Sequence, residues 1–225
     1  MNKFLHWLTT FAVRIFTHIT CRIDAPDLHK IPVQGPLIAI VNHTGQIEVP
    51  LLYGNLQPRL MTAWAKAETW KDNWFLNWIF NIWKIIPIRR GEADINALKG
   101  ALRALEDGYI FGIAPEGTRN KTGILRRALP GTVIVALHSG VPILPVAHWG
   151  GEVFLSNLKR FKRTDFHIRV GEPFTLNTNG LKVTGEIRQQ IADEMMYQIA
   201  ALLPEKYRGI YANTQQATQK YIRKI

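Results

Sequence analysis

A histidine and a glutamate five positions apart are the residues of this sequence whose types and spacing best suit acid–base chemistry. His43 and Glu48 lie in the segment Asn42-His43-Thr44-Gly45-Gln46-Ile47-Glu48, directly after an apolar run that predicts a buried strand. On a regular helix these side chains point about 140° apart, and on a strand they face opposite sides. At a strand–turn–helix junction, however, the carboxylate reaches back to the imidazole, fixes its tautomer and leaves the other ring nitrogen as a general base.

The spacing alone identifies no site, because His167 and Glu172 repeat it. That second pair lies along a predicted strand, where its side chains diverge, and we expect it to be structural. The strand–turn–helix context therefore makes His43 and Glu48 the candidate catalytic pair.

A second polar segment, Ala114-Pro115-Glu116-Gly117-Thr118-Arg119, also follows a predicted buried strand. Arg119 offers a planar fork that suits phosphate, and Thr118 offers a hydroxyl. Gly117 lets a ligand approach the backbone. Glu116 orients the arginine or accepts a hydrogen bond from a substrate hydroxyl. The alternative interpretation is an ordinary turn with a salt bridge.

Two arginines in Pro87-Ile88-Arg89-Arg90-Gly91 end another predicted strand, and Lys66 ends the strand before it. Together with Arg119 these cations predict a phosphate pocket, although such groups are more often solvated surface. The run Val141-Pro142-Ile143-Leu144-Pro145-Val146 is either the wall of an acyl channel or simply core.

Strands and helices alternate along the chain, which predicts an α/β fold with a central mixed, largely parallel sheet flanked by helices. Strands are expected at 37–41, 60–65, 85–88, 110–114, 141–148 and 166–170, and helices at 46–55, 68–83, 94–108, 132–138 and 183–203. Pro142 and Pro145 favour an edge or irregular position for the strand at 141–148. Ligands of such folds bind outside the carboxyl ends of the strands, where the polar segments lie.

Composition narrows the class of partner. The 225 residues include 28 Lys and Arg against 17 Asp and Glu, a net charge of +11. Such a surface suits anionic lipid, phosphorylated substrates or nucleic acid. Seven tryptophans favour a membrane–water interface, and no nucleic-acid module is recognisable. The single cysteine, Cys21, excludes a disulfide framework and a cysteine-based zinc site.

The ends of the chain differ from its middle. Apolar residues at positions 4, 8, 11, 15 and 19 form an amphipathic helical stripe that is too short to span a bilayer. We expect residues 1–21 to be a membrane-interface segment or, equally, a helix docked on its own domain, with no signal peptide. Trp70, Trp74 and Trp78 form a second stripe, which suits an interface or a core. The main domain is expected at 22–204, followed by a loose, polar and basic tail at 205–225.

Taken together, these segments resemble the 1-acyl-sn-glycerol-3-phosphate (lysophosphatidic acid) acyltransferase family of glycerolipid acyltransferases. The motifs of that family are N-H-x4-D, a P-V-D-R-G-like arginine motif, E-G-T-R and V-P-x-x-P-V, in this order. The matching positions here are 42–48, 87–91, 116–119 and 141–146. Glu48 departs from the pattern, because it stands where the family has aspartate.

The resemblance implies that His43 deprotonates the hydroxyl of a lysophospholipid acceptor while Glu48 orients the imidazole. The acyl donor would be acyl-CoA or acyl-carrier protein, and no metal or other cofactor is implied. The enzyme would work at a membrane surface with anionic lipids, as a peripheral or monotopic protein on the cytoplasmic face of the cell membrane. Another lysolipid or amino-lipid acceptor, and a non-catalytic lipid-binding protein, stay open as alternatives. The implied acceptor-binding residues are Arg90, Glu116, Gly117, Thr118 and Arg119.

Overall fold

A nine-stranded, mostly parallel sheet runs through the molecule, as a computed structural model shows for residues 3–45, 47–56, 59–72, 74–89, 91 and 94–225. Its strands are β1 (Cys21–Asp24), β2 (Leu37–Val41), β3 (Met61–Lys66), β4 (Ile86–Ile88), β5 (Ile110–Ile113), β6 (Ile143–Trp149), β7 (Thr164–Val170), β8 (Phe174–Leu176) and β9 (Ile222–Lys224). The order is β1-β7-β6-β2-β5-β3-β4, with β8 pairing β6 and β9. Strands β2 to β6 run parallel, whereas β7 and β8 pair antiparallel with β6.

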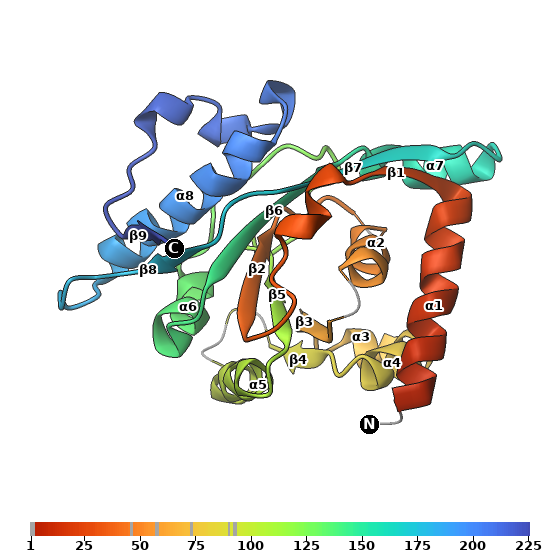
Figure 1. Ribbon diagram of the computed structural model, residues 1–225, viewed down its shortest axis with the longest axis horizontal. Helices are drawn as coiled ribbons and strands as arrows, with labels where there is room; N and C mark the ends of the chain where they lie inside the picture. Colours follow the sequence, from red (N-terminus) through yellow and green to blue (C-terminus); the bar gives the residue numbers. More distant parts are fainter. Residues whose placement is uncertain (1–2, 46, 57–58, 73, 90, 92–93) are drawn as a thin grey trace.

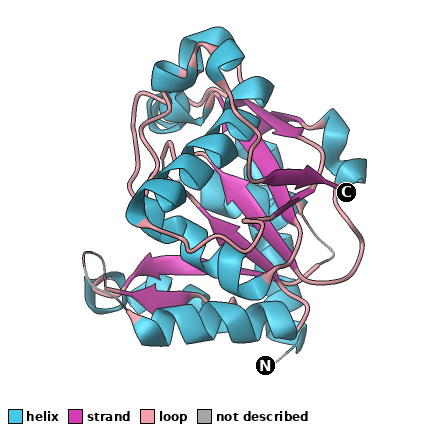
Figure 2. Cartoon of the chain, turned by 90° about the vertical axis from the view of Figure 1, so that its left-hand side faces the viewer, coloured by secondary structure: helices cyan, strands magenta, loops and turns pink. Residues whose placement is uncertain are grey.

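Helices pack on both sides of the sheet (Figures 1 and 2). They are α1 (Lys3–Thr20), α2 (Glu48–Asn55), α3 (Thr69–Asp72), α4 (Trp74–Ile82), α5 (Ile95–Glu106), α6 (Val133–Ser139), α7 (Phe154–Lys159) and α8 (Gly185–Leu202). Short 3-10 turns complete the chain: η1 (Pro26–Lys30), η2 (Pro130–Thr132), η3 (Gly151–Val153), η4 (Glu205–Tyr207), η5 (Gly209–Tyr211) and η6 (Thr214–Gln216).

Strand β2 divides the core in two, because successive side chains of a strand point to opposite faces. Ile38 and Ile40 join one cluster with α5, α6 and α8, whereas Leu37, Ala39 and Val41 join another with α2 and parts of α1, α4 and α7. The predicted α/β class is thereby confirmed.

The expectation that the strand at 141–148 lies at an edge is wrong. Strand β6 lies inside the sheet, between β2 and β7. Pro142 precedes the strand, and Pro145 carries its carbonyl toward Gly171, whose N–H donates to it at 2.9 Å. Gly171 stands just after β7 and before β8. The missing N–H of Pro145 therefore falls at the break between β7 and β8, where the pairing with β6 is interrupted in any case.

Helix α1 carries its apolar stripe outward. Phe4, Leu8, Phe11, Ile15 and Ile19 are all exposed, although the helix packs against α2. The inward face is the more polar one, with His6, Thr9, Thr10 and Thr17 buried. A helix docked only to complete its own core would have the reverse arrangement. Within the described ranges, no helix is long and apolar enough to cross a bilayer.

The aromatic stripe after β3 divides between surface and interior. Trp74 and Trp78 of α4 are exposed, whereas Trp70 packs against Phe80 at 4.9 Å between ring centroids. Helix α4 lies beside the N-terminal half of α1 (Figure 1). The exposed apolar residues of the two helices thus border one another.

The tail after Pro204 is ordered rather than loose. Tyr207, Tyr211 and Tyr221 are buried, and β9 pairs with β8. Glu194 of α8 is buried as well, and its carboxylate accepts hydrogen bonds from the hydroxyl of Thr218 and from the backbone N–H groups of Lys220 and Tyr221. This packing could not be predicted from the sequence, because the tail is polar in average composition and its apolar contacts come from widely spaced tyrosines.

Candidate active site

The polar segments found in the sequence meet at one edge of the sheet. Parallel strands place their carboxyl ends together, and β2, β5, β3 and β4 are parallel neighbours. The turn after β2 therefore carries His43, the turn after β5 carries Glu116, and the ends of β3 and β4 carry Lys66 and Arg89 to the same side of the molecule.

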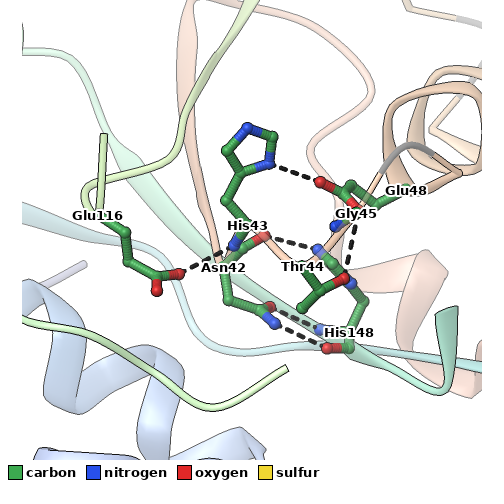
Figure 3. Close-up of polar contacts among 7 residues, drawn as sticks. All are labelled: Asn42, His43, Thr44, Gly45, Glu48, Glu116 and His148. Carbon is green, nitrogen blue, oxygen red and sulfur yellow. Dashed lines mark hydrogen bonds and ion pairs between the residues drawn. The ribbon is translucent and has the colours of Figure 1, made fainter. Parts of the chain in front are cut away.

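The expected contact between His43 and Glu48 is present (Figure 3). Nδ1 of His43 lies 2.5 Å from Oε1 of Glu48. Glu48 is the first residue of α2, so the turn of residues 42–47 lets its side chain reach back. A carboxylate only accepts hydrogen bonds, hence Nδ1 carries the proton and Nε2 keeps its lone pair. His43 also lines the cavity described below.

The second oxygen of Glu48 is also occupied. Its Oε2 accepts from the backbone N–H of Gly45 at 2.5 Å and from the hydroxyl of Thr44 at 3.2 Å. The Glu48 side chain is only 1% exposed, and this burial raises its pKa. The hydrogen bond from His43, the nearby imidazoles of His148 and His43 and the Gly45 N–H together lower the pKa by more than burial raises it. The pKa of Glu48 is therefore lowered overall. Glu48 is therefore a fixed anion beside the imidazole.

The backbone of His43 is fixed by the loop after β5. Its N–H donates to Oε1 of Glu116 at 2.9 Å, and its carbonyl accepts from the N–H of Asn120 at 2.7 Å. Oε2 of Glu116 accepts from the N–H of Arg126 at 3.0 Å. Burial raises the pKa of Glu116 despite these two donors. Both oxygens of this residue are thus engaged by the protein itself.

Asn42 and His148 join β2 to β6 beside the site. The Asn42 amide donates to the His148 carbonyl at 2.8 Å and accepts from its N–H at 2.9 Å. Nε2 of His148 lies 2.6 Å from the Asn42 carbonyl and must donate, since a carbonyl only accepts. Burial lowers the pKa of this imidazole, which stacks on Phe166, so His148 is a neutral donor. Its Nδ1 is buried without a hydrogen-bond partner among the described residues.

An apolar cavity of about 370 Å³ opens beside His43. Its walls come from β3, β4, β5, α5 and α6, and the Trp64 ring is held in place by a 3.0 Å bond from its N–H to the Ala97 carbonyl. The lining includes Trp64, Ile88, Leu98, Ile113, Leu129, Ile134 and Val135, with Arg89, Asp94 and Thr132 as polar members. The run at 141–146 contributes no lining residue among those described; its Ile143, Leu144 and Val146 are sheet core.

Gly117 lies against the cavity and needs to be a glycine. Its φ is +68°, a conformation that side chains disfavour, and a Cβ atom here would lie 2.3 Å from Leu129. The sequence-predicted reason for this glycine was a close approach by ligand. The structure adds the close approach of the Leu129 side chain.

The residues of the predicted phosphate pocket differ in whether they line the cavity. Thr118 and Arg119 are exposed and are absent from the cavity lining, and Lys66 is exposed with its nearest carboxylate, Glu68, 3.9 Å away. Arg90 lies outside the described residues. Arg89, the other arginine of the segment and also a member of the predicted phosphate pocket, lines the cavity.

Sequence reasoning missed Asn120, Arg126 and His148. Two of them act through backbone N–H groups, which every residue type carries, so their identities hold no signal. His148 lies 106 positions from Asn42, and only the pairing of β2 with β6 brings them together. Across the ranges that the structure describes, no three His, Cys, Asp or Glu side chains are grouped as a metal site would need.

Comparison with known proteins shows the family of this chain. The family model described as Acyltransferase matches residues 22–149, more than half of the chain. The chain therefore belongs to the acyltransferase family, and it is an enzyme of the kind that the lysophosphatidic acid acyltransferases represent.

Two bacterial relatives carry the name 1-acyl-sn-glycerol-3-phosphate acyltransferase. The protein from Bacillus subtilis is 24% identical over 72% of this chain and 78% of its own length. The one from Pseudomonas aeruginosa is 29% identical over 67% of this chain but only 56% of its own length. A third relative, the N-acylphosphatidylethanolamine synthase of Arabidopsis thaliana, is 32% identical over 54% of this chain and 46% of its own length.

The fold matches a solved structure as well. The crystal structure of PlsC, the 1-acyl-sn-glycerophosphate acyltransferase of Thermotoga maritima, superposes with a TM-score of 0.64 at 20% identity, covering 90% of this chain and 83% of that one. At this identity the likeness establishes the shared fold.

Proposed function

We propose that this chain is a membrane-surface O-acyltransferase that moves a fatty acyl group from acyl-CoA or acyl-carrier protein to the hydroxyl of 1-acyl-sn-glycerol-3-phosphate, giving phosphatidic acid. The observation that carries the proposal is the 2.5 Å contact between His43 Nδ1 and Glu48 Oε1 beside an apolar cavity. The contact leaves Nε2 of His43 as a base, and the cavity offers room for an acyl chain.

In the proposed reaction, Nε2 of His43 takes the proton of the acceptor hydroxyl as its oxygen attacks the thioester carbonyl carbon. The buried Glu48 carboxylate stabilises the imidazolium that forms. The tetrahedral intermediate then collapses, its carbon–sulfur bond breaks, and the imidazolium returns the proton to the departing thiolate. An ester and a free thiol result, so neither an oxidant nor a covalent acyl-enzyme is needed.

Both substrates are placed by the same edge of the sheet in this proposal. The acyl chain lies in the cavity walled by Trp64, Ile113 and Val135. The phosphate of the acceptor is held by exposed cations near its mouth, for which Arg89, Arg119 and Lys66 are the described candidates. Arg90 keeps the role that the resemblance implies. Glu116 positions His43 rather than binding substrate, because both of its oxygens accept from backbone N–H groups.

The outward apolar stripe of α1 supports the proposed membrane association. Seven large apolar side chains of this helix are exposed: Phe4, Trp7, Leu8, Phe11, Ile15, Phe16 and Ile19. Such a face gains free energy by lying in the interface of a bilayer, where the acceptor and product reside. We propose residues 1–21 as the interfacial segment of a peripheral or monotopic enzyme on the cytoplasmic face of the membrane.

The test is thiol release from palmitoyl-CoA in detergent, with and without lysophosphatidic acid. We expect acceptor-dependent release by the wild type, its loss in His43→Ala, and its retention in His29→Ala, which removes an exposed histidine of η1. Equal activity of His43→Ala and wild type would refute the assigned base. If the wild type binds lysolipid but releases no thiol with any donor, the chain is a lipid-binding protein instead.

A second acceptor class has specific support. The Arabidopsis relative is named for N-acylation of phosphatidylethanolamine, and Glu48 differs from the aspartate of the resembled motif. An amino lipid would give an amide in place of an ester. Mild alkaline hydrolysis of the labelled product separates the two, because the ester is cleaved and the amide survives.

A further inference from the structure

The turn between α7 and β7 carries the most exposed large apolar side chain among the described residues. Phe161 is 99% exposed, in the run Lys159-Arg160-Phe161-Lys162-Arg163, which we call the basic tip. An apolar ring that projects wholly into water contributes nothing to the core. The presence of this ring at the surface therefore calls for an explanation other than packing.

The backbone conformation of Phe161 adds a further free-energy cost to the exposure of its ring. The N–H of Phe161 bonds the Leu158 carbonyl at 3.1 Å, and the N–H of Lys162 bonds the Asn157 carbonyl at 2.9 Å. These bonds form a Schellman motif, in which Phe161 occupies the left-handed position with φ of 55°. Glycine is the residue that suits this position, and a side chain there is strained. The fold thus tolerates a strained backbone that projects an aromatic ring outward.

Four basic residues flank Phe161 in the sequence. The guanidinium of Arg163 donates to the carbonyls of His18 and Cys21 at the end of α1, which anchors the tip to that helix. Lys159, Arg160 and Lys162 are exposed, and within the described part of the chain no carboxylate is paired with them. A protruding aromatic ring among cations matches an anionic bilayer surface, where the ring enters the apolar boundary and the cations meet headgroups.

The tip continues the apolar face of α1. The ring of Phe16 meets that of Phe154 edge-on at 6.4 Å between centroids, so α7 adjoins the last turns of α1 (Figure 1). Ile19 at the end of α1 and Leu155 and Leu158 on α7 are exposed between that contact and the tip. Helix α1 itself offers few cations on its outward face, whereas the tip offers three. The two surfaces complement each other as an apolar and an electrostatic contact.

We propose that the basic tip is a second membrane-docking element, which recognises anionic lipid by inserting Phe161 while Lys159, Arg160 and Lys162 contact the headgroups. The inference rests on the membrane association proposed above and adds a site and a lipid class to it. A convex tip with a single protruding ring favours a bilayer over a protein partner, which usually receives such a ring in a pocket on a flatter contact surface.

The test compares binding of the full chain to two vesicle types, phosphatidylcholine alone and an equimolar mixture of phosphatidylcholine and phosphatidylglycerol. Phe161→Gly should bind the mixed vesicles about tenfold more weakly, while its thermal midpoint does not fall, because glycine suits the left-handed position. A folding defect cannot produce that combination. The control is Ile210→Ala, which shortens another exposed apolar side chain, in η5 and outside the basic tip.

A matched pair of triple variants tests the charges. Replacing Lys159, Arg160 and Lys162 by Gln should weaken binding to mixed vesicles by roughly a hundredfold, since each cation near an anionic surface contributes about fivefold. Replacing the exposed Lys99, Lys182 and Lys224 by Gln removes the same charge elsewhere and should have a much smaller effect. Binding to phosphatidylcholine alone should be equal in the two triple variants.

The outcomes separate the two proposals. If the wild type binds mixed vesicles and Phe161→Gly and the tip triple variant bind them equally well, the tip proposal is overturned and membrane association stands. If the wild type binds neither vesicle type, both are overturned. If the tip triple variant keeps vesicle binding but loses turnover with acyl-carrier protein and not with acyl-CoA, the tip serves an acidic protein, and the lipid proposal is wrong.

Discussion

Replacing Glu48 by Gln tests the proposed base more sharply than removing the histidine does. In the wild type, Oε2 of Glu48 accepts from the Gly45 N–H at 2.5 Å and from the Thr44 hydroxyl, and Oε1 faces His43. The glutamine oxygen must take the Oε2 position, because an amide nitrogen cannot accept from the Gly45 N–H. The amide NH₂ group then faces Nδ1 of His43.

That orientation reverses the tautomer of the imidazole. Nδ1 becomes the acceptor and Nε2 carries the proton, so the base is lost although the shape is almost unchanged. The negative charge that stabilises the imidazolium is lost too. A substitution of this kind in a hydrogen-bonded carboxylate–histidine pair lowers turnover by about ten-thousandfold, and we expect a fall of about a thousand- to ten-thousandfold in kcat. This corresponds to roughly 4–5.5 kcal/mol of activation free energy.

The assay is acceptor-dependent thiol release under saturating substrates, with Glu48→Asp as the matched control. Aspartate is about 1.5 Å shorter but keeps the charge and both acceptors, so we expect it to lose only about tenfold. Glu48→Gln combined with His43→Ala should be no worse than His43→Ala alone, since the pair acts as a unit. A Glu48→Gln enzyme with more than about a tenth of wild-type kcat would refute the assignment of tautomer and base.

Three further outcomes follow from the contacts around the site. His148→Phe keeps a ring against Phe166 but leaves the buried Asn42 carbonyl without its donor. The substitution should therefore lower the free energy of unfolding, measured by urea titration, by about 1–3 kcal/mol. An unchanged free energy of unfolding would contradict the role of His148 as a donor. Because the pKa of Glu48 is lowered from 4.5, its ionised form stabilises the fold above pH 4.5 and this contribution is lost as the pH falls through the lowered pKa. The stability difference between wild type and Glu48→Gln, measured in urea at a series of pH values, should shrink in that direction, and a difference that grows toward acid would show the sign to be wrong. Glu116→Gln leaves the N–H of His43 or of Arg126 without its acceptor, and should lower kcat about tenfold with little change in the KM for acceptor. Arg119→Ala should instead raise that KM. Steady-state kinetics with both variants checks these two effects, and the reverse pattern would contradict the assignment.

Much of the fold followed from local patterns in the sequence. Strand β2 was predicted with the observed bounds, and α5 with its Asp94 cap, whose carboxylate accepts from the Ala97 N–H at 3.0 Å. The short strands β1, β8 and β9 and the helix α7 were not predicted. Each is held by pairing or burial against distant parts of the chain, as when β1 pairs with β7, and an isolated stretch of three to six residues carries too little periodicity to indicate this.

The same distinction between local and distant contacts explains which parts of the site could be predicted. The contact between His43 and Glu48 was predictable because a single turn sets it. The engagement of Glu116 was not, because its carboxylate is bound by N–H groups 73 and 10 positions away. From the sequence, a glutamate next to an arginine suggests an ion pair or a substrate contact. In the described part of the chain Glu116 makes neither contact, because its carboxylate is only 4% exposed and its oxygens must accept hydrogen bonds from the protein itself.

These contacts explain why the motifs stand together although they are far apart in the chain. Three atoms of His43 are held by two segments of the chain: Nδ1 by Glu48 at the start of α2, and the N–H and the carbonyl by Glu116 and Asn120 of the loop after β5. Glu116 in turn holds the Arg126 N–H, and the same loop is bound by the tail, since the Leu125 N–H donates to the Tyr207 carbonyl at 2.8 Å. A base used for proton transfer must be placed to within a fraction of an ångström. The E-G-T-R segment thus has a structural reason to accompany the histidine that is independent of any phosphate it binds, and the ordered tail extends that support to the end of the chain.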